Sequence, residues 1–258
     1  MSLLATNQLS IRQGQRTLCH ALDINIKPGE CWLVLGENGC GKSTLLAALA
    51  GWHAPQAGKI NLHDKPLPSW TSQERAKRMA WLTQQDDSAF PLTVLEKALT
   101  GRHPHLGRWD WESTDDIALA QHQLARLDLV NLAGRDLATL SGGERRRASL
   151  AAVLAQQAEL LLLDEPLSQL DLRHQQQALA ILRDETNAGR SLVLVSHDPN
   201  HAHGFASHVL LLFGDGRWLA GPVQETLTEA NLSALYRHPV RSHLVDGQPW
   251  FLPGPHVA

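Results

Sequence analysis

The stretch from Gly36 to Thr44 constrains this chain more than any other, because it matches the pattern G-x-x-x-x-G-K-[ST] at every fixed position. Glycines in such a loop let the main chain approach a ligand closely, and the backbone N–H groups converge on clustered negative charge. Apolar residues 31–35 before the loop indicate a buried strand, and residues 44–50 have the pattern of a helix that Gly51 ends. This order of strand, loop and helix predicts a site for the phosphates of a nucleotide.

Every residue of the loop is a candidate for contact with these phosphates: Gly36, Glu37, Asn38, Gly39, Cys40, Gly41, Lys42, Ser43 and Thr44. Lys42 supplies an ammonium for the β- and γ-phosphates, and the hydroxyl of Ser43 is expected to be a ligand of Mg²⁺.

Composition excludes several classes of protein. The chain has 258 residues, enough for one large domain or for one domain with a sizeable insert. Its net charge of −3 does not favour a nucleic-acid partner. No apolar run approaches the roughly 18 residues of a membrane helix, and the first residues lack the pattern of a secretory signal. The three cysteines lack the paired spacing of a disulfide framework or a zinc site. We therefore expect a soluble chain in a reducing compartment, with any membrane role depending on a partner.

Alternating strand and helix patterns on both sides of the loop predict an α/β fold, a P-loop NTPase with a central, mainly parallel sheet covered by helices. Short apolar alternation in residues 1–30 predicts an additional antiparallel β part at the N-terminus. Strands are also expected at 59–62, 79–83, 160–163 and 192–196, and helices at 72–77 and 174–186.

Residues 86–156 change in character, because 92–99, 117–129 and 145–156 carry helical apolar spacing with little strand signal. The predicted single domain therefore has a nucleotide-binding core (1–85 and 157–220), a helical subdomain (86–156) and a C-terminal tail (221–258). The basic run 145–147 is expected to spread around a solvated helix face. The tail is expected to hold a helix over 228–236 and to end in a loosely held, proline-rich segment.

A second pattern that suggests chemistry is the apolar run 160–163, which is followed directly by Asp164 and Glu165. A buried strand that ends here would bring Asp164 toward the phosphates and Mg²⁺, and Glu165 toward the water that attacks the γ-phosphate. The alternative is a helix that starts at Asp164 with two N-terminal acids. The loop upstream favours the first interpretation.

Taken with these pieces, residues 140–144 (Leu-Ser-Gly-Gly-Glu) and 196–198 (Ser-His-Asp) make the chain resemble the ATP-binding subunits of ABC transporters over almost its whole length. The resemblance implies that ATP and Mg²⁺ are bound. It also implies a head-to-tail homodimer, in which Ser141, Gly142 and Gly143 hold ATP on the opposite subunit. Without the family, a Ser-Gly-Gly turn before a helix is only a cap.

The resemblance assigns further residues. It makes Gln84 the glutamine that contacts Mg²⁺ and joins the helical subdomain to the core. It makes Asp171 the aspartate that crosses the dimer seam, and His197 the histidine that contacts the γ-phosphate.

Three positions depart from the family pattern. The ring that the family places about 25 residues before the loop, to stack on adenine, is replaced by Ile11, which predicts apolar contact without stacking. Arg146 stands where the family often has Gln, and little effect is expected. Cys40 lies inside the phosphate loop, where N–H groups and Lys42 are expected to favour its thiolate and make it easy to alkylate.

The remaining histidines, at 103, 105, 201 and 203, are expected to be solvated or capping groups rather than metal ligands. Trp109 and Trp111 are expected to pack locally, with docking of a partner as the alternative.

Short signals at 93–96, 101–105 and 227–232 resemble the subgroup that serves importers of iron–siderophore, haem, cobalamin and related chelates or oxyanions. The predicted function is ATP hydrolysis that powers such import through a separate integral membrane permease, with a solute-binding protein as an indirect partner. The chain is then expected at the cytoplasmic face of the inner cell membrane, peripheral through its permease. The alternatives are a soluble ABC-type ATPase without a membrane pore, as in iron–sulfur cluster assembly, an exporter ATPase, and a nucleotide-dependent module that does not hydrolyse ATP.

Overall fold

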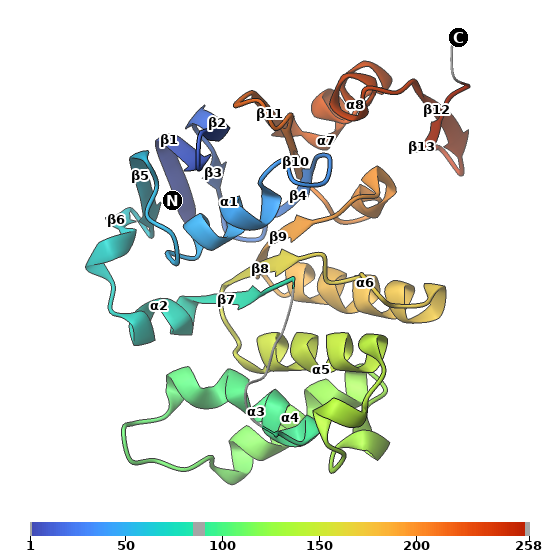
Figure 1. Cartoon of the computed structure of the whole chain (residues 1–258). Helices are drawn as coiled ribbons and strands as arrows, with labels where there is room; N and C mark the ends of the chain where they lie inside the picture. The colour runs from blue at the N-terminus through green and yellow to red at the C-terminus, as the bar shows by residue number, and fades with distance from the viewer. Residues whose placement is uncertain (1, 85–90, 256–258) are drawn as a thin grey trace. The chain divides into compact units, whose positions relative to one another are not determined.

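The computed structural model describes residues 2–84 and 91–255 of the chain. The chain forms two compact units, Met1–Ser69 with Ser191–Ala258 and Trp70–Arg190 (Figure 1). The boundary expected at residues 85 and 86 lies outside the described residues, as do the last three residues of the expected tail. The division into core, helical subdomain and tail stays a prediction.

The first unit contains the antiparallel β part that the N-terminal pattern predicted. Its strands have the order β2-β1-β5-β6, and β3 also pairs with β1. The elements are β1 (Leu4–Gln13), β2 (Arg16–Leu22), β3 (Asn25–Ile26), β5 (Ala57–Leu62), β6 (Lys65–Pro66) and the 3₁₀ turn η1 (Leu67–Ser69).

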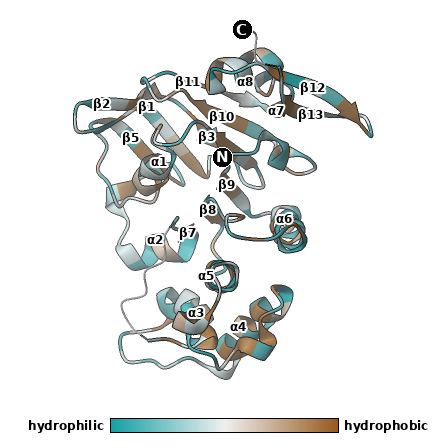
Figure 2. Ribbon diagram, turned by 45° about the vertical axis from the view of Figure 1, so that its right-hand side comes forward, coloured by the Kyte–Doolittle hydropathy of each residue, from teal (hydrophilic) through white to brown (hydrophobic). Residues whose placement is uncertain are grey.

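A second set of strands in the first unit has the order β11-β10-β4-β9, in which β4 pairs in parallel with both β10 and β9. Every residue of β4 and β9 is buried, and Figure 2 shows β9 and β10 as largely apolar. Buried parallel strands of this kind are continuous apolar runs, which explains why Cys31–Leu35 was readable as a strand. The elements are β4 (Cys31–Leu35), α1 (Lys42–Leu49), β9 (Ser191–Val195), η5 (Pro199–Ala202), β10 (His208–Leu212), β11 (Trp218–Pro222), α7 (Val223–Thr226) and α8 (Glu229–Tyr236).

The second unit is mainly helical and holds one parallel strand pair, β7 with β8. Its elements are α2 (Ser72–Arg78), β7 (Met79–Leu82), α3 (Val94–Leu99), η2 (Thr100–His105), α4 (Thr114–Arg126), η3 (Val130–Leu132), η4 (Leu137–Thr139), α5 (Gly142–Ala155), β8 (Leu160–Asp164) and α6 (Leu172–Asn187). The strands and helices predicted along both units are confirmed, with ends that differ by a few residues.

Side-chain caps explain where four of these helices begin. The N-cap residues Thr71, Thr93, Ser113 and Ser141 each exchange hydrogen bonds with an acidic residue three positions later, which forms a capping box. Each box satisfies two backbone N–H groups that the first helical turn leaves without partners. These starts are therefore encoded locally.

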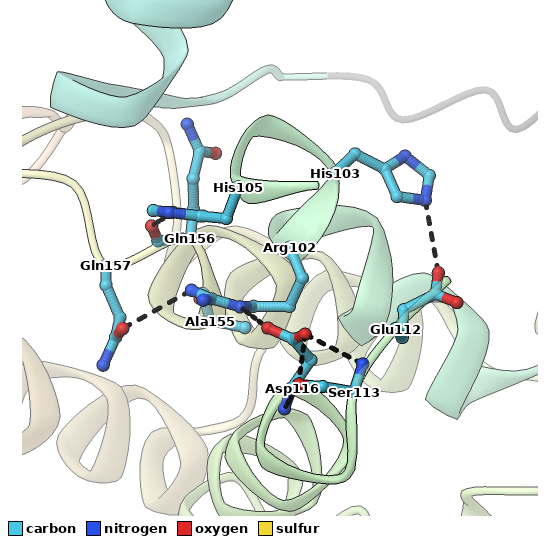
Figure 3. A network of polar contacts seen from close by, with 9 residues as sticks. All are labelled: Arg102, His103, His105, Glu112, Ser113, Asp116, Ala155, Gln156 and Gln157. Carbon is cyan, nitrogen blue, oxygen red and sulfur yellow. Dashed lines mark hydrogen bonds and ion pairs between the residues drawn. The ribbon is translucent and has the colours of Figure 1, made fainter. Parts of the chain in front are cut away.

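The end of α5 is capped from a distance by the segment Gly101–His105 (Figure 3). Arg102 Nη1 donates to the carbonyl of Ala155 at 2.8 Å, and His105 Nε2 donates to that of Gln156 at 2.8 Å. Arg102 Nε also donates to Asp116 at 2.7 Å. Hydrogen bonds from Ser113 and then Arg102 lower the pKa of Asp116 to about 2. Cationic and N–H groups at a helix C-terminus satisfy its last carbonyls.

The C-terminal residues correct one prediction. The proline-rich segment was expected to be loosely held, but it forms an antiparallel hairpin of β12 (Val240–Val245) and β13 (Gln248–Pro253). Phe251 in β13 is buried, and its backbone N–H and carbonyl both bond to Asn200. Proline at a strand end or on an edge is compatible with a hairpin, so its frequency alone did not indicate disorder.

The segment Gly101–His105 can pack against α5 only because residue 101 is glycine. A Cβ at this position would lie 2.0 Å from the carbonyl oxygen of Ala152 in α5. We predict that Gly101→Ala lowers the free energy of unfolding by about 1–3 kcal/mol, the cost of overpacking. Gly134→Ala is the matched control, since a Cβ at exposed Gly134 meets nothing within 4 Å, and it should change stability by less than about 0.5 kcal/mol. Urea unfolding of both variants measures the difference. Equal effects would contradict the role of Gly101.

Candidate nucleotide site

The phosphate loop joins the buried strand β4 to helix α1, as the sequence predicted. Gly39 and Gly41 have φ values of 73° and 107°, which favour glycine. A Cβ on Gly36 would lie 2.5 Å from Cys40 Sγ and 2.6 Å from the carbonyl of Leu212. The glycines are therefore required by the loop's own conformation and packing.

Lys42 lies at the first position of α1 and is only 6% exposed. Its Nζ donates to the carbonyl oxygens of Gly36 at 2.8 Å and Glu37 at 3.0 Å. The ammonium is thus held over the loop by acceptors of the loop itself. It is positioned to serve an anion at the N-terminus of α1, where the helix dipole also favours negative charge.

Parallel pairing brings His197 to the same sheet edge as this loop. Val34 in β4 is in register with Val195 in β9, so the residues that follow both strands emerge together. His197 is exposed two residues past β9, while its neighbour Ser196 is buried and bonds to His201 Nδ1 at 2.7 Å.

Cys40 differs from the prediction. Its side chain is 2% exposed, and burial raises the pKa of its thiol despite the opposing charge of Lys42. The expectation of a favoured, easily alkylated thiolate is therefore wrong, because loss of water outweighs the nearby positive charge.

Ile11 is also corrected as an adenine contact. It lies in β1 opposite Cys19 and is 4% exposed, so its side chain packs in the core and offers almost no surface to a base. The residue of this hairpin that reaches the loop is Arg16, which donates to the carbonyls of Gly39 at 3.0 Å and Gly214 at 2.9 Å. Sequence reasoning missed Arg16, because a single arginine beside a turn carries no motif.

In the second unit, Gln84, Asp164 and Glu165 lie at the carboxyl ends of the paired strands β7 and β8. Asp164 ends β8 and is 1% exposed, which excludes the alternative of a helix start. Glu165 follows with a φ of 50°. Such a conformation is unfavourable for a residue with a Cβ and is common at functional sites. Gln84 is exposed, two residues beyond β7.

Arg146 holds these two ends together and is not on a solvated face. Its guanidinium donates to the carbonyl of Thr83 at 2.6 Å and to that of Asp164. Arg146 and Arg147 are 5% and 7% exposed, since nearly every side of α5 is buried. The expectation of a solvated basic run is wrong for Arg146 and Arg147, whereas Arg145 is exposed as expected. The small effect expected of Arg146 stays a prediction.

Ser141, Gly142 and Gly143 begin α5 beside the turn that leads to Asp171. Cβ atoms on the two glycines would lie 2.4 Å from Gln169 Oε1 and 2.8 Å from its carbonyl. Asp171 caps α6 by accepting from His174 N at 2.9 Å, and this bond is the main cause of its lowered pKa. Together these residues line a cavity of about 550 Å³ with Glu144, Arg147, Leu170 and His174.

His105, His201 and His203 make hydrogen bonds within the fold. His105 caps α5, and His203 Nε2 donates to the carbonyl of Pro249 at 2.8 Å. Among the described residues, no group of three or more His, Cys, Asp or Glu side chains is arranged to hold a metal ion. Trp109 and Trp111 do not pack locally as expected, because they are 85% and 88% exposed.

Arg146 generates a direct test. We predict that Arg146→Ala lowers the free energy of unfolding by about 1–3 kcal/mol, because two backbone carbonyls lose a charged donor. Arg145→Ala is the control. The side chain of Arg145 is exposed, so its removal should change the free energy of unfolding by less than about 0.5 kcal/mol. Chemical unfolding monitored by tryptophan fluorescence compares the two. A neutral Arg146→Ala would refute its linking role.

Comparisons with known proteins identify the family of the chain. The family described as ABC transporter matches residues 19–168. The hemin import ATP-binding protein HmuV of Streptomyces coelicolor is 40% identical over 238 residues, covering 92% of this chain and 84% of the relative. The protein of the same name from Pseudomonas aeruginosa is 38% identical over 253 residues, covering 93% of this chain and 98% of the relative.

A solved inward-facing structure of a putative metal-chelate type ABC transporter superimposes with a TM-score of 0.85 at 30% identity, covering 99% of this chain and 98% of that chain. None of the helices in the described part of the chain is long and apolar enough to cross a membrane. The chain therefore belongs to the ABC transporter family, in which it is an ATP-binding protein and an ATPase.

Proposed function

We propose that this ATPase powers the import of a haem-type metal chelate through a separate membrane permease. The observation that carries the proposal is the similarity to hemin import ATP-binding proteins along more than nine-tenths of the chain. The superposition on a metal-chelate type transporter supports the same substrate class. The haem itself contacts other subunits, since the groups described above suit phosphate chemistry.

In the first unit, Lys42 and the N–H groups of the phosphate loop bind the phosphate chain of ATP. The ammonium of Lys42 exchanges the carbonyls of Gly36 and Glu37 for phosphate oxygens, which are stronger acceptors because they are charged. His197, at the neighbouring strand end, donates to the γ-phosphate and thereby holds the group that is transferred.

In the second unit, Glu165 orients the attacking water and accepts its proton. Its strained backbone keeps the carboxylate in one orientation at the end of β8. The carboxylate of Asp164 and the amide oxygen of Gln84 in this unit are hard oxygen donors of the kind that fit Mg²⁺, and so is the hydroxyl of Ser43 in the first unit. When bound, this ion neutralises charge on the β- and γ-phosphates.

The working form is a homodimer. Ser141 caps α5, Gly142 and Gly143 present N–H groups at its start, and the adjacent cavity of about 550 Å³ has room for the phosphates of an ATP held by a second copy. Asp171 at the rim of this cavity belongs to the same contact.

The chain is peripheral at the cytoplasmic face of the inner membrane and docks on its permease, which receives haem from a solute-binding protein. A cavity of about 150 Å³ close to Gln84, lined by residues of β7, α3, η2 and α5 including Trp81, Lys97 and Thr100, supports a docking site there. Residues 86–156 act as the helical subdomain, which contributes α3, η2 and α5 to this site, whereas β7 belongs to the core segments 1–85 and 157–220.

We predict that Glu165→Gln lowers ATP hydrolysis by roughly 10²–10⁴-fold while ATP binding persists, because Gln keeps the shape but cannot accept the proton. Uncleaved ATP should then convert the variant from monomer to dimer, whereas ADP should not, since it lacks the γ-phosphate. Phosphate release and light scattering with each nucleotide measure both effects. Glu159→Gln, the same change just before β8, is the control. A variant that hydrolyses ATP at the normal rate would refute the role of Glu165.

A transport assay tests the substrate class. The wild-type chain should co-purify with an integral membrane protein, and the reconstituted complex should move hemin into the compartment that contains ATP. Replacement with the Glu165→Gln variant should abolish uptake. Hemin movement in the opposite direction would favour an exporter. Absence of any membrane partner would favour the soluble ABC-type ATPase, and either result would overturn the proposal.

A further inference from the structure

The segment that follows His197 is held by the C-terminal residues of the chain. Tyr236, the last residue of α8, donates its hydroxyl to the carbonyl oxygen of His197 at 3.2 Å. The chain has only one tyrosine, and this residue is half-buried. The bond fixes the peptide group of His197 itself rather than a distant part of the loop.

Three residues further along, Asn200 makes a two-point contact with the hairpin. Its Nδ2 donates to the carbonyl of Phe251 at 3.1 Å, and its Oδ1 accepts from the N–H of Phe251 at 2.9 Å. Because Phe251 is buried, this pairing attaches η5 to a well-packed position in β13.

His203 adds a third attachment beyond η5. Its Nε2 donates to the carbonyl of Pro249, and its ring lies 4.7 Å from that of Trp250. Figure 1 shows the hairpin β12–β13 beside the orange turn that follows β9. Residues 197–203 are thus bonded at three points to residues 236–251. We call residues 236–251 the C-terminal clasp.

The surroundings of Tyr236 keep its hydroxyl a donor. Burial raises the pKa of Tyr236, and the nearby Asp198 and Cys40 act in the same direction. The next residue, Arg237, has its Nε 3.7 Å from Glu37 Oε2 in the phosphate loop. That exposed pair contributes little stability, but it shows that the end of α8 lies beside both nucleotide-facing loops.

We propose that the C-terminal clasp positions His197 for ATP hydrolysis, with Tyr236 as the positioning residue that acts directly on its backbone. The inference rests on the proposed role of His197. A side chain at the end of a strand can reach the γ-phosphate reproducibly only if its backbone is fixed, because small displacements of reacting groups cost large factors in rate. The clasp supplies this restraint from outside the sheet.

The test measures single-turnover hydrolysis and ATP affinity in the full-length chain. Tyr236→Phe, which removes only the hydroxyl, should lower the hydrolysis rate by about 2–13-fold, the equivalent of one hydrogen bond, with an unchanged Kd for ATP. In a His197→Ala background the same change should have no further effect, because a residue that acts through His197 has nothing left to position.

A matched pair of asparagines tests the hairpin contact. Asn200→Asp keeps the shape but can no longer donate to Phe251, and it should also slow hydrolysis. Asn231→Asp in α8 loses a similar donor, to the carbonyl of Thr226 at the end of α7, and should leave the rate unchanged. Unchanged thermal midpoints exclude general unfolding as the cause.

The outcomes separate the two claims. If His197→Ala hydrolyses ATP normally, the proposed role of His197 fails and the clasp inference fails with it. If His197→Ala is impaired but Tyr236→Phe is not, only the clasp inference is overturned. Equal losses from Tyr236→Phe in both backgrounds, or a weaker Kd with an unchanged rate, would likewise overturn it.

Discussion

Parallel pairing of buried strands is the constraint on which the site depends. In the first unit it sets the ends of β4 and β9 at one edge, so that the phosphate loop and His197 emerge together. In the second unit it does the same for β7 and β8, with Gln84 beyond one strand and Asp164 and Glu165 at the other. Buried strands cannot slip in register without exposing apolar side chains and breaking backbone bonds, so these polar groups are held firmly.

Buried positive charge at the ends of elements is the second recurring device. Lys42 is held by carbonyls of its own loop, Arg146 links the carbonyls of Thr83 and Asp164, and Arg102 caps α5. In each case backbone carbonyls supply the partners that a desolvated cation requires. Lys42 differs from the two arginines because its acceptors belong to its own loop, whereas theirs lie in other structural elements.

Several of the corrected predictions share one cause, although Trp109 and Trp111 were corrected by their exposure. Cys40 was interpreted from its neighbours in sequence, and Ile11 and Arg146 mainly from the family pattern. Each of the three is buried by long-range packing. Burial raises the pKa of the Cys40 thiol, removes Ile11 from contact with a base, and turns a surface-like arginine into an internal link. The hairpin at the C-terminus was missed in the same way, because its attachment to Asn200 joins residues about fifty positions apart.

The sequence alone determined the elements whose signals are local: the glycine pattern of the phosphate loop, the apolar strands, the capping boxes and the order of the motifs. It therefore predicted the α/β fold, the family and the candidate residues from Gly36 to Thr44. Only the tertiary structure decided how these residues are supported, including Arg16 on the loop, Arg146 between two strand ends and Tyr236 on His197. The physical reason is that a motif needs neighbouring residues in fixed conformations, whereas a single hydrogen bond or buried side chain between distant residues leaves no pattern in the sequence.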